Sequence, residues 1–128
     1  MSFARRMPVW FWWVVVIWLV CMPWPGMAPQ TNREVQLVPF VGDADRPRDV
    51  IANVLLFLPF GYLFALAHPR RGYLLLVAVA AAVSLTAEAL QLLGPARFPS
   101  ATDVVVNTGG AFAGGWWRHR SRRRVREK

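Results

Sequence analysis

The sequence predicts an all-α fold: an integral membrane four-helix bundle formed by a single domain over residues 1–128. The chain is 55% hydrophobic, with 7 Trp and a positive mean hydropathy. A soluble domain of this size cannot bury so much apolar surface. The apolar residues gather into four segments of roughly membrane length, and most of the arginines stand at the ends of these segments.

Four helices are expected, at about residues 8–24, 50–67, 72–93 and 100–117. The first, PVWFWWVVVIWLVCMPW, follows Arg5 and Arg6 and nearly has the length of a bilayer span. A cleaved secretory signal is the alternative interpretation of this segment, and we favour an uncleaved transmembrane helix. In the second helix Asp49 is a suitable N-cap, and Pro59 predicts a kink because it removes a backbone hydrogen bond.

The third and fourth helices form a hairpin around a Gly-Pro turn. Ser100 starts the fourth helix, in which Gly110 and Gly114 form a small-xxx-small pair suited to close helix contact. This helix is expected to end near Trp117. Residues 118–128 are then expected to form a basic cytoplasmic tail.

The basic residues predict the orientation in the membrane. On one side of the four helices fall Arg5, Arg6, Arg70, Arg71 and the seven basic residues of 118–128; on the other fall only Arg33, Arg46, Arg48 and Arg97. The positive-inside rule therefore places both termini in the cytoplasm and the loop between the first and second helices outside. Because Trp116 and Trp117 directly precede the basic tail, we expect this tail to contact anionic lipids rather than nucleic acid.

With this orientation, the strongly polar residues of the second, third and fourth helices all lie in the outer half of the membrane. They are Asn53, Glu88, Gln91, Asp103 and Asn107, with Arg97 in the external turn. Ser84, Glu88 and Gln91 follow i, i+4, i+7 spacing and so share one helix face. Ionisable groups inside apolar segments are costly to bury, so their presence indicates a functional site by default. We therefore predict a polar pocket that opens outward.

Structural roles are the alternative for the same residues. Ser100-Ala101-Thr102-Asp103 fits a capping box, in which Asp103 serves the start of the fourth helix. Asn53 and Asn107 are suited to hydrogen bonds between helices. Ser84 is expected to bond a backbone carbonyl of its own helix. Glu88 is expected either to pair with Arg97 or to serve a ligand or proton, and its charge state stays open.

These motifs resemble the VanZ-like family of small bacterial multi-pass membrane proteins. The resemblance runs from about Leu37 to Gly115 and includes the strings NVLLFLPFG and DVVVNTGG. It implies a protein of the bacterial plasma membrane, associated with resistance to the lipoglycopeptide teicoplanin, whose biochemical activity is poorly defined. It carries over, by motif, the positions Asn53, Glu88, Gln91, Arg97, Asp103 and Asn107.

This sequence departs from the family pattern at one point. Many members carry several Asp after the arginine, whereas here Ser100 and Thr102 stand beside the single Asp103. A metal site built from clustered carboxylates is therefore not expected. Cys21 stands alone, without the spacing of a metal-ligand or disulfide motif. We expect neither a metal nor a cofactor.

Three functions are consistent with the sequence. The first, which we favour, is a cell-envelope protein whose outer pocket binds an amphipathic ligand such as a lipid headgroup or a lipoglycopeptide. The second is a membrane enzyme acting on a lipid-linked envelope substrate, with Glu88 and Asp103 as acid and base and Arg97 on a phosphate. The third is a purely structural or partner-binding helical bundle. The sequence does not indicate an oligomeric state, and we assign no catalytic residue.

Overall fold

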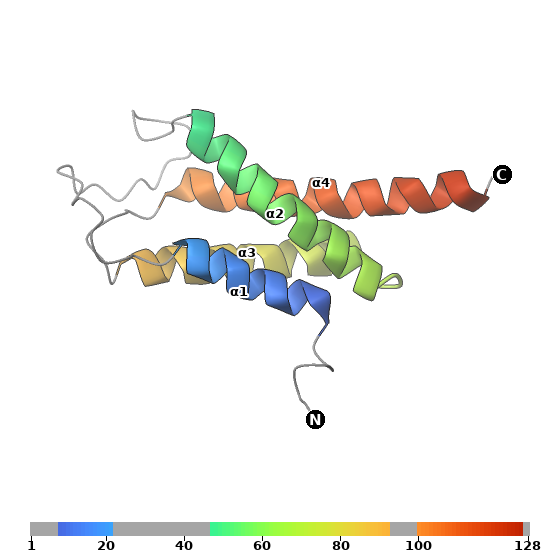
Figure 1. The fold of residues 1–128 in the computed structure, drawn as a ribbon, viewed down its shortest axis with the longest axis horizontal. Coiled ribbons are helices and arrows are strands. Elements are labelled where there is room, and N and C mark those ends of the chain that lie inside the picture. Colours follow the sequence, from blue (N-terminus) through green and yellow to red (C-terminus); the bar gives the residue numbers. More distant parts are fainter. Residues whose placement is uncertain (1–7, 22–46, 93–99, 127–128) are drawn as a thin grey trace, which may run out of the picture.

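The computed structural model describes residues 8–21, 47–92 and 100–126, which form four helices. They are α1 (Val9–Cys21), α2 (Pro47–Ala67), α3 (Tyr73–Gln91) and α4 (Ala101–Arg126). Figure 1 shows α2 and α4 running in one direction, with α1 and α3 opposite to them. The described residues therefore confirm the all-α fold class.

The molecule has two chemically different ends. We call the end at which α2 and α4 begin and α3 ends the polar end. The opposite end, where α2 ends, α3 begins and α4 finishes in its run of arginines, is the basic end. The N-terminal end of α1 also lies at the basic end (Figure 1).

Two helices are long and apolar enough to cross a membrane, by length and composition: Val50–Ala67 within α2, and Tyr73–Gln91. The apolar part of α1, Val9–Leu19, is shorter. The second and third expected helices therefore have membrane-helix character. The four-helix bundle within a bilayer and the cytoplasmic location of both termini stay predictions. The predicted external loop and the Gly-Pro turn lie outside the described residues.

Two helix boundaries differ from the sequence-based expectation. α2 begins at Pro47, so Asp49 lies in the first helical turn and is not the N-cap. Proline is favoured there because its fixed φ suits the first helical position, where its missing N–H costs nothing. α4 does not end near Trp117 but continues to Arg126. Its last residues include neither Gly nor Pro, and arginine is a good helix former.

α2 and α4 make the most extensive helix contact in the molecule, and glycine makes it possible. A Cβ added at Gly61 would overlap the carbonyl oxygen of Ala111, and one at Gly114 would overlap that of Leu58. At Gly110 an added Cβ would lie 3.0 Å from the Val54 carbonyl oxygen. The predicted small-residue pair of α4 therefore faces α2, where the two backbones nearly touch.

An aromatic core joins α1 to α2. Phe57 and Phe60 are fully buried, and Trp10 meets Phe60 and Phe64 edge-to-face at centroid distances of 6.4 and 5.4 Å. The indole Nε1 of Trp13 donates a hydrogen bond to the Leu56 carbonyl, one turn before Pro59. α2 continues through this proline. Through this hydrogen bond, α1 holds the turn of α2 that directly precedes Pro59.

Candidate functional site

The polar face of α3 is turned into the protein. Ser84, Glu88 and Gln91 are 0%, 6% and 2% exposed, although the adjacent Leu85 and Leu92 are largely exposed. Their i, i+4, i+7 spacing places them on one stripe of the helix, as the sequence indicates. Burial of polar side chains is unfavourable unless they find hydrogen-bond partners, so the question is what each of them contacts.

Glu88 caps the start of α4 from the neighbouring helix. The backbone N–H of Ser100 donates to Glu88 Oε2 at 2.9 Å. Ser100 is the N-cap itself: its hydroxyl accepts from the Thr102 N–H at 3.2 Å, and its carbonyl accepts from the N–H of Asp103 at 3.1 Å. In a capping box the N-cap N–H bonds to the side chain three residues later. Here that N–H reaches a carboxylate on α3.

Asp103 links α4 to α2. Asn53 Nδ2 donates to Asp103 Oδ1 at 2.7 Å, across 50 residues of sequence. Asn53 is buried, and Asp103 is half-buried in the first turn of α4. Asp103 therefore does more than cap its own helix. The amide–carboxylate bond fixes the position of the second turn of α2 relative to the first turn of α4.

Asn107 and Ser84 form a third contact between helices. Asn107 Nδ2 donates to Ser84 Oγ at 2.9 Å, and both side chains are buried. The sequence suggested a helix-linking role for Asn107 but assigned Ser84 to its own backbone. The contact was not foreseen because it depends on the register between α3 and α4.

Two buried acceptor atoms of this cluster lack a donor. Among the described residues, no hydrogen-bond partner meets Gln91 Oε1 or Asn107 Oδ1. The two side chains are only 2% and 3% exposed. A buried polar atom without a partner costs roughly 1–3 kcal/mol. A ligand that donates a hydrogen bond to either atom would remove this energetic cost.

We refer to Asn53, Ser84, Glu88, Gln91, Ser100, Asp103 and Asn107 as the polar cluster. Four of the six site residues predicted from the sequence, Asn53, Glu88, Asp103 and Asn107, make these hydrogen bonds between helices, and Gln91 is buried on the same face of α3 as Glu88. The sixth, Arg97, lies outside the described residues, so the Glu88–Arg97 pair stays a prediction. Among the described residues, no group of three His, Cys, Asp or Glu side chains is placed to hold a metal ion.

The Asn53–Asp103 contact can be tested by a double-mutant cycle. Asn53→Ala and Asp103→Ala should each lower the free energy of unfolding by about 1–3 kcal/mol, because each leaves a partly buried partner without its hydrogen bond. The double variant should be less destabilised than the sum by about 1 kcal/mol or more, measured by unfolding in detergent. Strictly additive effects would contradict a direct contact.

A family model described as VanZ/LLP1 matches residues 9–118. The chain belongs to the VanZ/LLP1 family. It is 32% identical over 105 residues to Protein VanZ of Enterococcus faecium, an alignment that covers 79% of this chain and 65% of that protein. The chain thus spans about two thirds of that relative's length. No solved structure matches.

Membership of the VanZ/LLP1 family confirms the resemblance seen in the sequence motifs. The matched residues 9–118 include all four helix starts and every member of the polar cluster. Together with the two candidate spans in α2 and α3, the family indicates a membrane protein of the VanZ-like envelope type.

Proposed function

We propose that this protein is a multi-pass protein of the bacterial plasma membrane whose polar cluster binds an amphipathic ligand from the outer side, and that it contributes to teicoplanin resistance. The observation that carries the proposal is the pair of buried acceptors, Gln91 Oε1 and Asn107 Oδ1, left without donors beside a well-bonded cluster. A ligand with hydroxyl, amide or ammonium donors would remove that cost.

The charge distribution supports an outward-facing cluster. Arg70, Arg71, Arg118, Arg120, Arg122, Arg123, Arg124 and Arg126 belong to the basic end, whereas Arg48, in the first turn of α2, is the one arginine of the described helices at the polar end. Positive charge beside spanning helices favours the cytoplasmic side. The polar end, with Asn53, Glu88 and Asp103, then faces outward.

Apolar surface beside the cluster favours an amphipathic ligand. Four leucine or isoleucine side chains are 58–63% exposed: Ile51 and Leu55 on α2, Leu85 on α3, and Leu92 at the C-cap of α3. They flank the cluster along the parts of the helices near the polar end. A lipid headgroup or a lipoglycopeptide could place its donors at the cluster and its acyl chain along these side chains. Teicoplanin has both parts and is the ligand we propose to test.

Gln91→Leu is the most informative variant for this proposal. It removes an unpartnered buried acceptor at similar volume, so it should leave the free energy of unfolding unchanged or raise it by about 1 kcal/mol. Teicoplanin binding to the purified full chain should nevertheless weaken about tenfold, the effect of losing one good hydrogen bond. Calorimetric titration in detergent measures the affinity, and the teicoplanin concentration that inhibits growth of expressing cells measures resistance.

Thr86→Ala is the matched control, because Thr86 lies on the exposed face of the same helix and its hydroxyl donates to the Ala82 carbonyl one turn earlier. It should change neither affinity nor resistance. A glycopeptide without a lipid tail should bind more weakly than teicoplanin. If Gln91→Leu folds and binds teicoplanin as the unmodified chain does, the proposed ligand site is wrong.

A structural role for the cluster is the second candidate. It is favoured by the three hydrogen bonds that join α2, α3 and α4: Asn53–Asp103, Ser100–Glu88 and Asn107–Ser84. On this view Gln91→Leu has no effect on ligand binding or resistance. The cluster would then serve to hold the hairpin of α3 and α4 against α2.

A further inference from the structure

A second candidate site lies at the basic end, far from the polar cluster. A cavity of about 610 Å³ opens there between the first residue of α3 and the last turns of α4. Its lining is Tyr73, Trp116, His119, Arg120, Arg123 and Arg124. The volume falls within the range of small-molecule sites, and the lining combines cations with aromatic rings.

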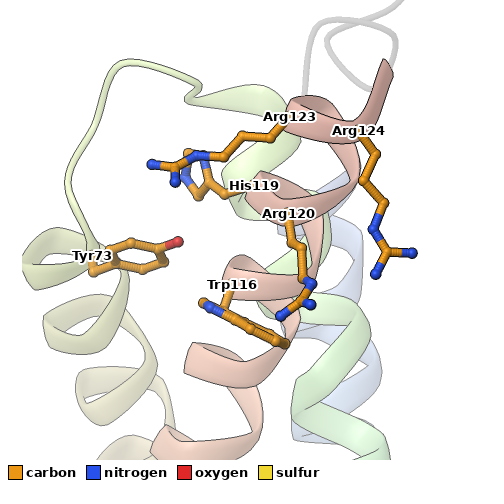
Figure 2. A pocket seen from close by; sticks show the side chains of 6 residues that line it. All are labelled: Tyr73, Trp116, His119, Arg120, Arg123 and Arg124. Carbon is orange, nitrogen blue, oxygen red and sulfur yellow. The ribbon is translucent and has the colours of Figure 1, made fainter. Parts of the chain in front are cut away.

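Two contacts position four of the side chains around this cavity. The ring of Tyr73 meets the His119 ring edge-to-face at 5.1 Å, and the guanidinium of Arg120 lies 5.1 Å from the centre of the Trp116 ring. Figure 2 shows Arg123 and His119 on the side of α4 toward Tyr73, whose hydroxyl points to α4. Hydrogen-bond donors from two helices therefore border one space.

The positive charge of this region is not balanced along the helix. The sequence contains no Asp or Glu between Asp103 and Glu127, and none between Asp49 and Glu88. α3 also begins beside the cavity, and its N-cap, Gly72, supplies no side-chain hydrogen bond to the first turn. The positive end of the α3 dipole thus adds to the charge of the three arginines.

The position of the cavity indicates where its ligand comes from. Tyr73 is the first residue of a candidate membrane span, and the exposed Trp116 and Trp117 stand at the same end of the molecule. Aromatic residues with adjoining arginines are typical of the headgroup layer. An anion that reaches this cavity at that depth is most simply the headgroup of a lipid.

We propose that this cavity binds the phosphate of an anionic phospholipid headgroup on the cytoplasmic side. Arg120 and Arg123 donate charge-assisted hydrogen bonds to the phosphate oxygens, a geometry for which the guanidinium fork is suited. The Tyr73 hydroxyl and His119 add donors, and the acyl chains extend along the apolar surface of α3. The arginines at the end of α4 then form part of a defined lipid-binding site, in addition to attracting anionic lipids through their overall charge.

The test titrates the full chain in detergent with short-chain phosphatidylglycerol and, separately, with short-chain phosphatidylcholine, using calorimetry. Phosphatidylglycerol should bind at least about tenfold more tightly, because the choline cation is repelled by the arginines. Arg120→Gln with Arg123→Gln should weaken phosphatidylglycerol binding by about tenfold or more. Tyr73→Phe, which keeps every charge, should weaken it by about threefold.

The matched control is Arg70→Gln with Arg122→Gln. It removes the same charge from two exposed arginines outside the cavity lining, and it should change affinity less than about twofold. Circular dichroism confirms that each variant is folded. Equal losses in the two double variants would show diffuse attraction and overturn the proposal. So would inorganic phosphate binding as tightly as phosphatidylglycerol, since the ligand would then be a soluble anion.

Discussion

Gly114→Ala is expected to lower the free energy of unfolding by at least about 2 kcal/mol, although it adds a single methyl group. An added Cβ at this position would overlap the Leu58 carbonyl oxygen and lie 2.9 Å from the Tyr62 amide nitrogen. Both obstacles are backbone atoms of α2, so no side-chain rotation relieves the overlap. α4 must move away from α2, and the aromatic and hydrogen-bonded contacts between the two helices weaken with it.

Gly109→Ala provides a control on the same helix. An added Cβ there meets nothing within 4 Å, and Gly109 is exposed. Because alanine favours the helix over glycine, this variant should be neutral or more stable by roughly 0.5–1 kcal/mol. Thermal unfolding in detergent, followed by circular dichroism, compares the two. If both variants unfold alike, the close approach of α2 and α4 is wrong.

The α2–α4 contact also shows how far the sequence alone predicts this fold. Runs of apolar residues and the Gly and Pro residues that interrupt them indicate where the helices lie, because they reflect local chemistry. The Gly110/Gly114 pair indicates close contact for α4. Gly61 likewise indicates a close approach to a neighbouring helix, but the sequence does not identify α4 as that neighbour, since pairing depends on which helix faces are buried against each other. The extension of α4 to Arg126 does not follow from the hydrophobic pattern, because the apolar run ends at Trp117 and the arginines beyond it are compatible with either a helix or an extended tail.

The sequence predicts most of the residues of the polar cluster, but it does not predict which of them form hydrogen bonds with one another. Helical spacing puts Glu88 and Gln91 on one face, and a common depth brings Asn53 and Asp103 together. The spacing does not predict that Glu88 accepts a hydrogen bond from the backbone N–H of Ser100. Every residue except proline has a backbone N–H, so the residue types do not indicate which N–H a carboxylate will bind. The capping-box motif predicts that the Ser100 N–H bonds to the side chain of Asp103, whereas in the structure its acceptor is the carboxylate of Glu88 on α3.

Glu88→Ala is also expected to destabilise the protein. It leaves the N–H of Ser100 without the carboxylate acceptor that starts α4, and it should lower the free energy of unfolding by about 1–3 kcal/mol. Hydrogen exchange of the Ser100 amide should become faster, which reports on this bond directly. Glu88→Gln keeps an oxygen in the same place, so it should cost less than about 1 kcal/mol. Thr86→Ala should have little effect.

The pair of Glu88 variants also separates the two candidate roles of the cluster. If Glu88→Gln is stable and binds teicoplanin normally, the carboxylate serves mainly as a cap for α4. If it is stable but binds the ligand more weakly, the charge of Glu88 acts on the ligand and the cap is a second role of the same group. Comparable stability of Glu88→Ala and Glu88→Gln, with unchanged exchange at Ser100, would refute the capping contact itself. Glu88→Ala and Glu88→Gln differ in whether an acceptor oxygen remains for the Ser100 N–H. Glu88→Gln differs from the unmodified chain chiefly in the loss of the negative charge.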